Sequence, residues 1–181
     1  CEGTLDYVLR EMTGPHGGFY SSQDADSEGE EGKYFVWSSQ EIEALLDEDA
    51  SVFRAYYGVT DGGNFEGGNI LHIARDPEAL ARDINIPLTK LEEILERARN
   101  ILLSARSERV PPAMDDKVVT AWNGLMLRTF AEAACSLNRE DYKQAAIASG
   151  TFLLKELYKD RRLMRTYRQG KARHQGYLED Y

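Results

Sequence analysis

Residues 17–37 read GGFYSSQDADSEGEEGKYFVW and combine glycines, aromatic residues and a run of acids. Residues 17–24 and 33–37 are predicted to be extended, and the acidic, glycine-bearing link between them is typical of a hairpin loop. Directly afterwards, Ser38 and Glu41 have the spacing of a capping box, which predicts the start of a helix. We therefore expect a long β-hairpin inserted between helices.

Apolar residues at helical spacing predict helices on both sides of this hairpin. The first helix should end at residues 13–15, because a glycine and a proline there are strong stop signals. The helix that begins after Ser38 is expected to break at the acidic residues 47–49 and to resume shortly afterwards. Residues 58–68 then form a polar, glycine-rich loop, and residues 69–74 form a short strand at best.

The second half of the chain alternates between two kinds of predicted helix. Residues 89–92 form a capping-box pattern, and the amphipathic helix after them has the charged face of an outer helix. Residues 118–137 are apolar nearly all round and rich in small residues, which predicts an inner, closely packed helix. Residues 142–158 are again amphipathic, and residues 163–181 contain a second hairpin with its turn at 168–171. This alternation predicts an all-α fold of stacked helix pairs with β-hairpin excursions.

Composition limits the class of protein. The chain has 181 residues, 42% of them hydrophobic, which suits one globular domain. Its net charge of −9 argues against nucleic acid or an anionic membrane as partner, and no apolar run approaches the ~18 residues of a membrane-spanning helix. Cys1 and Cys135 are too few for a disulfide framework, so we expect a cytoplasmic protein with Cys135 buried. Because neither end reads as a natural boundary, we expect a fragment that self-associates through uncovered apolar flanks.

Carboxylates stand beside aromatic and amide side chains at two places, and burying such a mixture is costly without partners. At the first place, Asp24 and Asp26 follow Tyr20 and Gln23. Sugar-binding clefts use this chemistry, because acids transfer protons, amides bond hydroxyl groups and aromatic faces contact the ring. We take Asp24 and Asp26 as candidate catalytic residues, and Tyr20 and Gln23 as candidate substrate-binding residues. The plain alternative is a solvated acidic loop tip, which fits residues 28–31 well.

The second place is the sequence DDK at residues 115–117, followed by Trp122 and Asn123. One aspartate would serve as a helix cap, but two of them exceed that role. An asparagine in an apolar helix needs a hydrogen-bond partner if it is buried, whereas a tryptophan there is more often part of the core. Asp116 is therefore a candidate catalytic residue, and Asp115, Trp122 and Asn123 are candidate substrate-binding residues.

The end of the chain supplies the remaining candidates. Glu179 and Asp180 are candidate catalytic residues, and His174, beside the second hairpin, is a candidate substrate-binding residue. His16, His72 and His174 show no metal-ligand spacing, so we expect no metal site. Because no phosphate-binding glycine loop or serine nucleophile elbow is present, we also expect no cofactor.

Six blocks of this sequence are long and unusual: residues 18–29, 32–37, 63–67, 115–117, 120–125 and 176–181. Together they resemble the YyaL family, which includes the spermatogenesis-associated, thioredoxin-domain-containing proteins. The resemblance implies a thioredoxin-like domain followed by an (α/α) toroid of the six-hairpin glycosidase type. The chain has no CxxC motif, so we expect residues 1–181 to be a single domain, part of the toroid, without the thioredoxin-like half.

Two classes of function remain open. In the first, Asp24, Asp26, Asp116 and either Glu179 or Asp180 converge in a cleft, where paired carboxylates bind or act on a carbohydrate or another small molecule. In the second, the chain is a non-catalytic scaffold or regulatory interaction domain attached to a thioredoxin-like module, since a fold alone does not determine function. Convergence of the acids favours the first class, and dispersion of the acids favours the second.

Overall fold

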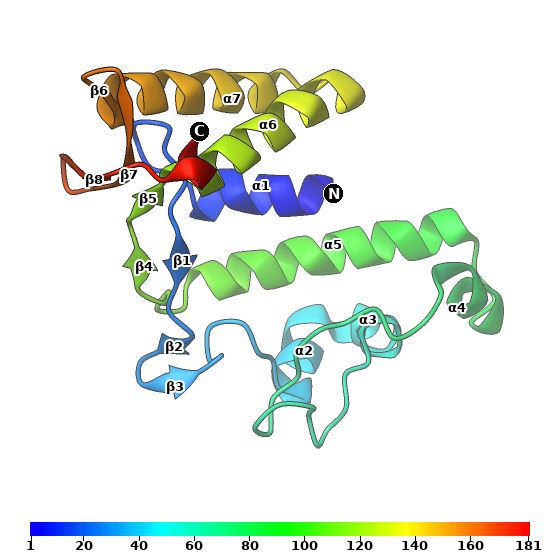
Figure 1. Ribbon diagram of the computed structural model, residues 1–181. Helices are drawn as coiled ribbons and strands as arrows, with labels where there is room; N and C mark the ends of the chain where they lie inside the picture. The colour runs from blue at the N-terminus through cyan, green and yellow to red at the C-terminus, as the bar shows by residue number, and fades with distance from the viewer. The chain divides into compact units, whose positions relative to one another are not determined.

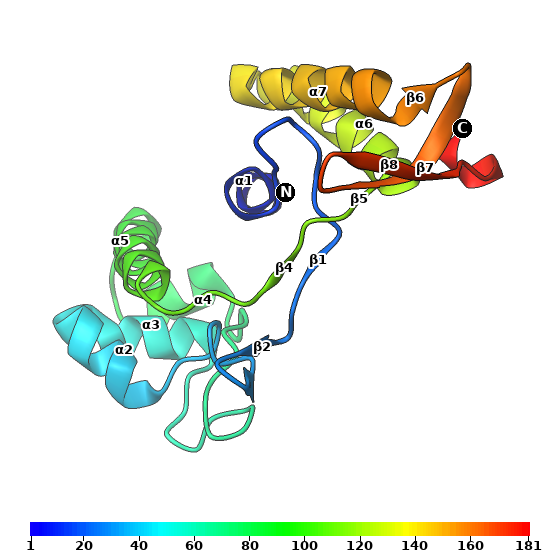
Figure 2. The same cartoon turned by 90° about the vertical axis from the view of Figure 1, so that its left-hand side faces the viewer.

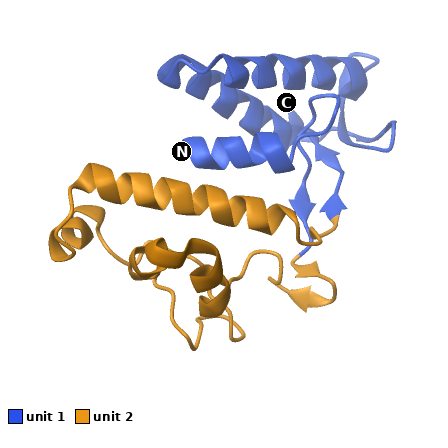
Figure 3. Cartoon of the chain, turned by 180° about the vertical axis from the view of Figure 1, so that it is seen from behind, with its two compact units in different colours: residues 1–24, 114–181 blue, residues 25–113 orange.

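The computed structural model describes residues 1–181, which divide into two compact units (Figure 3). The first unit contains residues 1–24 and 114–181, and the second contains residues 25–113. The second unit is thus one continuous segment inserted into the sequence of the first. Each unit has its own buried apolar cluster, so each is described by itself.

Three helices build most of the first unit: α1 (Glu2–Glu11), α6 (Thr120–Leu137) and α7 (Glu140–Phe152). Helices α6 and α7 pack side by side (Figures 1 and 2), and α7 continues into a π-helical turn at Leu153–Leu157. Aromatic side chains fill the space between the three helices, with the rings of Phe19 and Phe130 stacked 5.2 Å apart. The buried members of this core are Leu5, Val8, Phe19, Phe130, Ala133 and Tyr142.

A small antiparallel sheet completes the first unit. Strand β7 (Arg162–Arg168) pairs with β8 (Lys171–Gln175), with β5 (Val118–Val119) and with β6 (Tyr158–Lys159). The tight Arg168 to Lys171 connection confirms the predicted second hairpin. A 3₁₀ turn at Leu178–Asp180 follows β8.

The first predicted hairpin is wrong in its pairing. Residues 17–24 do not pair with residues 33–37: β1 (Ser22–Gln23) instead pairs with β4 (Met114–Asp115). Only the acidic link forms a hairpin of its own, between β2 (Asp26–Ser27) and β3 (Glu30–Glu31). Trp37 makes an isolated bridge to Asn69, which is all that appears of the predicted strand at 69–74. The two segments that were expected to pair with each other thus pair with residues far along the chain, which local turn signals cannot predict.

The second unit is helical. It contains α2 (Ser39–Leu46), α3 (Ala50–Tyr57), α4 (Pro77–Asp83) and α5 (Leu88–Ser107). The capping box at Ser38 and Glu41 is confirmed by both of its hydrogen bonds, and the expected break is a 3₁₀ turn at Asp47–Asp49. The predicted capping box at residues 89–92 is wrong, because α5 already begins at Leu88 after Pro87. Proline suits a helix start, since its φ is already helical and it has no amide hydrogen to leave unpaired.

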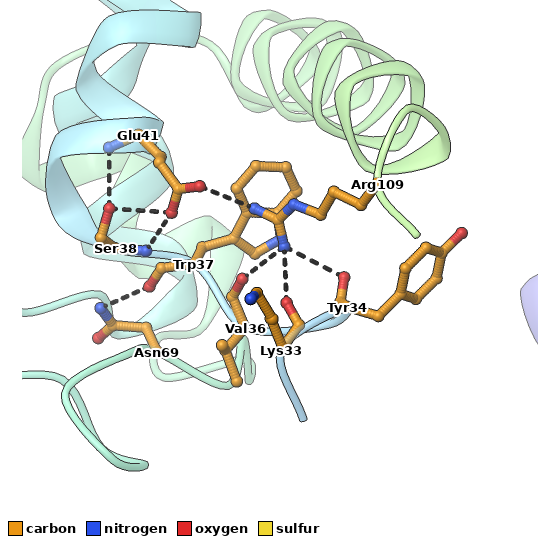
Figure 4. A network of polar contacts seen from close by, with 8 residues as sticks. All are labelled: Lys33, Tyr34, Val36, Trp37, Ser38, Glu41, Asn69 and Arg109. Atoms are coloured by element: carbon orange, nitrogen blue, oxygen red, sulfur yellow. Dashed lines mark hydrogen bonds and ion pairs between the residues drawn. The ribbon is translucent and has the colours of Figure 1, made fainter. Parts of the chain in front are cut away.

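Arg109 closes the second unit by joining its last residues to its first (Figure 4). The guanidinium lies 3.9 Å from the ring centroid of the buried Trp37. Its Nη1 donates to the carbonyl oxygens of Lys33, Tyr34 and Val36, and its Nη2 pairs with Glu41 at 3.0 Å. This stacked, multiply bonded geometry needs the planar donor array of arginine.

The all-α toroid expected from the sequence is contradicted. The chain is 52% helical and 17% strand, and its strands form several small antiparallel sheets. The cause is visible at β7, whose seven residues bond three other strands and so make the second hairpin part of a sheet. No helix is both long enough and apolar enough to cross a membrane.

Helix α6 also departs from the expected inner helix. Phe130 and Ala133 are buried on one side, but Trp122 is 58% exposed and Leu125 is 67% exposed on another. Cys135, expected to be buried, is exposed as well. Helix α6 has apolar residues on all of its faces, but only one of these faces is buried. Another apolar face is exposed to solvent.

Candidate ligand-binding site

The sheet of the first unit separates the candidate residues onto two faces. Val118 pairs with Tyr167, and Val119 pairs with Thr166. Because successive side chains of a strand point to opposite faces, Val118 and Tyr167 share one face, and Val119 and Thr166 share the other. A hollow lies on each face, and each hollow contains different candidate residues.

We call the hollow on the Val119 face the tryptophan hollow. It encloses about 850 Å³, which is within the usual size of small-molecule sites. Helix α6 supplies an exposed aromatic and apolar wall, while β7 and the last turn supply polar groups. Six of its lining residues are Trp122, Leu125, Arg165, Thr166, Glu179 and Tyr181.

Asp180 holds the wall of the tryptophan hollow in place. Its side chain is completely buried. Oδ1 accepts the amide hydrogen of Ala121 at 3.1 Å, and Oδ2 accepts that of Tyr177 at 2.8 Å. Arg165 lies 3.3 Å from Oδ2 as a third partner. Asp180 therefore acts as an N-terminal cap for α6 from a distant part of the chain, since Ala121 is in the first turn, where amide groups lack helical partners.

The neighbouring Glu179 is different, because its side chain is open to solvent. It pairs with Arg165 Nη1 at 2.6 Å. The same guanidinium lies 4.6 Å from the ring centroid of Tyr177, which fixes its plane. The tryptophan hollow thus presents one accessible carboxylate and one oriented guanidinium beside an exposed indole.

The side-chain amide of Asn123 is hydrogen-bonded to backbone groups, and Asn123 does not line this hollow. Its Oδ1 accepts the Phe19 amide hydrogen at 2.7 Å, and its Nδ2 donates to the carbonyl oxygens of Phe19 and Val119 at 3.0 Å. The side chain is buried, so these bonds satisfy the partner requirement inferred from the sequence. Asn123 fastens the segment around Phe19 to α6.

The hollow on the Val118 face, which we call the tyrosine hollow, contains Tyr20 and Asp116. Asp116 Oδ1 accepts from Arg168 Nε at 2.5 Å. The adjacent Asp115 pairs with Lys117 instead, and the hydrogen bond from Lys117 lowers the pKa of the Asp115 carboxyl. Neither aspartate caps α6, which is the role that the plain alternative gave them.

The remaining candidates line neither hollow. Gln23 accepts a hydrogen bond from the hydroxyl of Tyr7. Asp24 is exposed in the first unit, His174 is exposed on β8, and Asp26 belongs to the second unit. The structure therefore brings Trp122, Glu179 and Asp180 together in one hollow, and Tyr20 and Asp116 together in another. No group of three or more His, Cys, Asp or Glu side chains is arranged to hold a metal ion.

Sequence reasoning missed Arg165, Tyr167 and Arg168, although all three contact or line these hollows. Their place on a strand of the predicted hairpin could be read from the sequence, but the hollow that each one serves could not. Arg165 and Tyr167 stand two positions apart on β7, yet Arg165 lines the tryptophan hollow and Tyr167 lines the tyrosine hollow. The pairing of Arg168 with Asp116 was not foreseeable, since the two residues are 52 positions apart.

Comparison with known proteins gives relatives along the full chain. The chain is 30% identical to human spermatogenesis-associated protein 20 and 29% identical to its mouse counterpart, in each case over 100% of this chain. Over 82% of its own length, the chain is also 28% identical to an uncharacterised protein of Caenorhabditis elegans. The chain spans only 28% of the human and mouse proteins. No family model matches the sequence.

Proposed function

We propose that the first unit binds a carbohydrate in the tryptophan hollow. The observation that carries this proposal is the exposed indole of Trp122 in the same hollow as the Arg165–Glu179 ion pair. An indole face offers apolar contact to the C–H face of a sugar ring, while the carboxylate and guanidinium accept from and donate to its hydroxyl groups. A mixed aromatic and charged wall of this kind suits a polyhydroxyl ring better than a purely apolar ligand.

The geometry supports binding more than hydrolysis. Hydrolysis of a glycosidic bond normally uses two carboxyl groups about 5 to 9.5 Å apart on either side of that bond. In the tryptophan hollow, Glu179 is accessible, but both oxygens of Asp180 are occupied by amide hydrogens. Asp180 is therefore not free to donate a proton or attack a sugar, and we propose a binding site with Glu179 as a ligand-contacting residue.

Fluorescence offers a direct test, because the chain has only two tryptophans. Trp37 is 4% exposed, so acrylamide should quench mainly Trp122. We expect one member of a panel of malto-, cello- and chito-oligosaccharides to protect Trp122 from quenching in a saturable manner. Glu179→Ala should weaken this protection roughly tenfold, as the loss of a charged hydrogen bond predicts.

Leu154→Ala is the matched control, since Leu154 is exposed but lines neither hollow. It should leave the sugar titration unchanged. If no sugar in the panel protects Trp122, or if Glu179→Ala and Leu154→Ala behave alike, the carbohydrate proposal is wrong.

The second candidate function is protein recognition, as part of a scaffold or regulatory domain. It is favoured by the apolar side chains near the same hollow, above all Leu125 and the 92% exposed Leu178. If the hollow binds protein, Trp122 should become protected from acrylamide in the absence of sugar. This protection should grow as the protein concentration is raised or when a partner protein is added. Concentration-independent quenching together with saturable sugar protection would support the carbohydrate site instead.

A further inference from the structure

We propose that the tyrosine hollow is a second, separate site, which binds a small planar aromatic ring carrying an N–H or O–H donor. It lies on the opposite face of the sheet from the tryptophan hollow, and the proposal does not depend on carbohydrate binding there. Six of its lining residues are Gly14, Gly18, Tyr20, Asp116, Phe152 and Tyr167.

The size and floor of the hollow favour one small ring. It encloses about 260 Å³, which is slightly below the ~300 Å³ at the lower end of drug-sized sites. Its floor is apolar, because Val118 and Phe152 are buried in the surrounding cluster. Tyr20 and Tyr167 are half-buried walls, and the rings of Phe152 and Tyr167 meet edge to face at 5.1 Å. Aromatic walls of this geometry favour a ligand that offers its own ring faces and edges.

Two glycines let the backbone approach the aromatic walls of the hollow closely. A Cβ atom at Gly14 would lie 2.9 Å from the ring of Tyr20, and one at Gly18 would lie 2.8 Å from Phe152. The backbone therefore contacts the aromatic walls directly, with no side chain between them. A side chain at either glycine would displace these rings and change the shape of the hollow.

The polar side chains that line the hollow are those of His16, Tyr20, Asp116, Tyr167 and Gln169, and we argue the edge of the ligand from the acid and the two tyrosines. Asp116 Oδ1 is bonded to Arg168, but its Oδ2 accepts no hydrogen bond from the protein. The hydroxyl groups of Tyr20 and Tyr167 also have no protein partner. The charge of Asp116 is balanced by Arg168, so a neutral ligand suits the site better than a cation. An N–H or O–H group on its ring would donate to Oδ2 in a charge-assisted bond, and a tyrosine hydroxyl would serve as a second partner.

Phenol and cyclohexanol give a clean pair of probes, since they share a hydroxyl group and a six-membered ring but only phenol is planar and aromatic. We expect phenol to produce saturable amide shifts at Gly14, Gly18 and Gly170 in two-dimensional NMR of the complete chain. Cyclohexanol should bind roughly tenfold more weakly, because it loses the aromatic contacts.

Two variants locate the interaction. Asp116→Asn keeps the shape of the hollow and should weaken phenol severalfold by removing the charge-assisted bond, whereas Leu154→Ala should have no effect. Tyr20→Leu should abolish saturation by removing a wall. If Tyr20→Leu does not fold, the proposal is still tested by the comparison of phenol with cyclohexanol and by the Asp116→Asn variant. Equal binding of both probes, shifts outside the hollow, or an Asp116→Asn protein indistinguishable from Leu154→Ala would overturn the proposal.

Discussion

At the scale of the residue, Asp180 illustrates how a buried carboxylate is made stable by backbone amides. Two amide hydrogens and one guanidinium surround it, so the cost of removing its charge from water is offset. Neighbouring Glu179 has only Arg165 and remains in solvent. Two adjacent acids, which the sequence presents as equivalent, thus have different roles: one supports a helix, and the other is available to a ligand.

Replacing Asp180 with alanine should lower the free energy of unfolding by about 2 kcal/mol, because α6 loses its cap and the amides of Ala121 and Tyr177 lose their acceptors. Asp180→Asn should cost less, since the amide oxygen still accepts one bond. Urea denaturation followed by circular dichroism measures both. Glu179→Ala is the control and should change stability by less than about 0.5 kcal/mol. A Glu179→Ala effect as large as that of Asp180→Ala would contradict the assigned roles.

At the scale of the element, Arg139 joins α1 to the start of α7. Its Nη2 bonds Asp6 at 2.9 Å and Asp141 at 2.6 Å, and its guanidinium lies 4.2 Å from the ring centroid of Tyr142. The hydroxyl of Tyr142 donates to Asp6 at 2.7 Å. Burial of Tyr142, aided by this bond, raises its pKa to about 12. The junction therefore combines a buried aromatic ring with an ion-pair network.

This junction should make stability depend on pH in acid. The hydrogen bond from Arg139 lowers the pKa of Asp141 from 3.8 to about 2. A carboxyl with a lowered folded pKa contributes its full stability above about 3.8 and loses it as the pH falls towards 2. Arg139→Gln should flatten this loss in urea midpoints measured from pH 5 to pH 2. An unchanged pH profile in Arg139→Gln would show that the network contributes nothing.

How far the sequence predicted these elements depended on the range of the interactions involved. The capping box at Ser38 and the hairpin turn at 168–171 were predicted correctly, because both depend on residues a few positions apart. The partner of β1 was missed because β4 lies about ninety positions further along, beyond any local signal. For the candidate site, Trp122 and Glu179 were named from residue type alone. Arg165 was missed because its partners Glu179 and Asp180 are 14 and 15 positions further along the chain.

At the scale of the whole molecule, the second unit is a continuous segment with its own core and its own closing contacts. Arg109 near its end bonds three carbonyl oxygens near its beginning. Residues 25–113 contain all members of the larger apolar cluster, including Trp37, Phe53 and Leu91. A segment that buries its own apolar surface and closes its own ends has what an independent domain requires.

We therefore expect a polypeptide of residues 25–113 to fold by itself. Its single tryptophan, Trp37, should show the blue-shifted emission of a buried indole, and unfolding in urea should be cooperative. Arg109→Met in this polypeptide should lower the urea midpoint by removing the closing bonds, while Arg82→Met, at an exposed position on α4, should not. A red-shifted emission without a cooperative transition would show that the segment needs the rest of the chain.

The insertion of this segment has a consequence for protein synthesis. During translation, residues 1–24 leave the ribosome long before β4 and α6, to which β1 and Phe19 are hydrogen-bonded. The inserted segment has all its partners as soon as residue 113 has emerged, so it can fold first while the amino-terminal residues wait. At about 5 to 20 residues per second, that wait lasts for several seconds, during which the apolar face of α1 has no α6 or α7 to pack against.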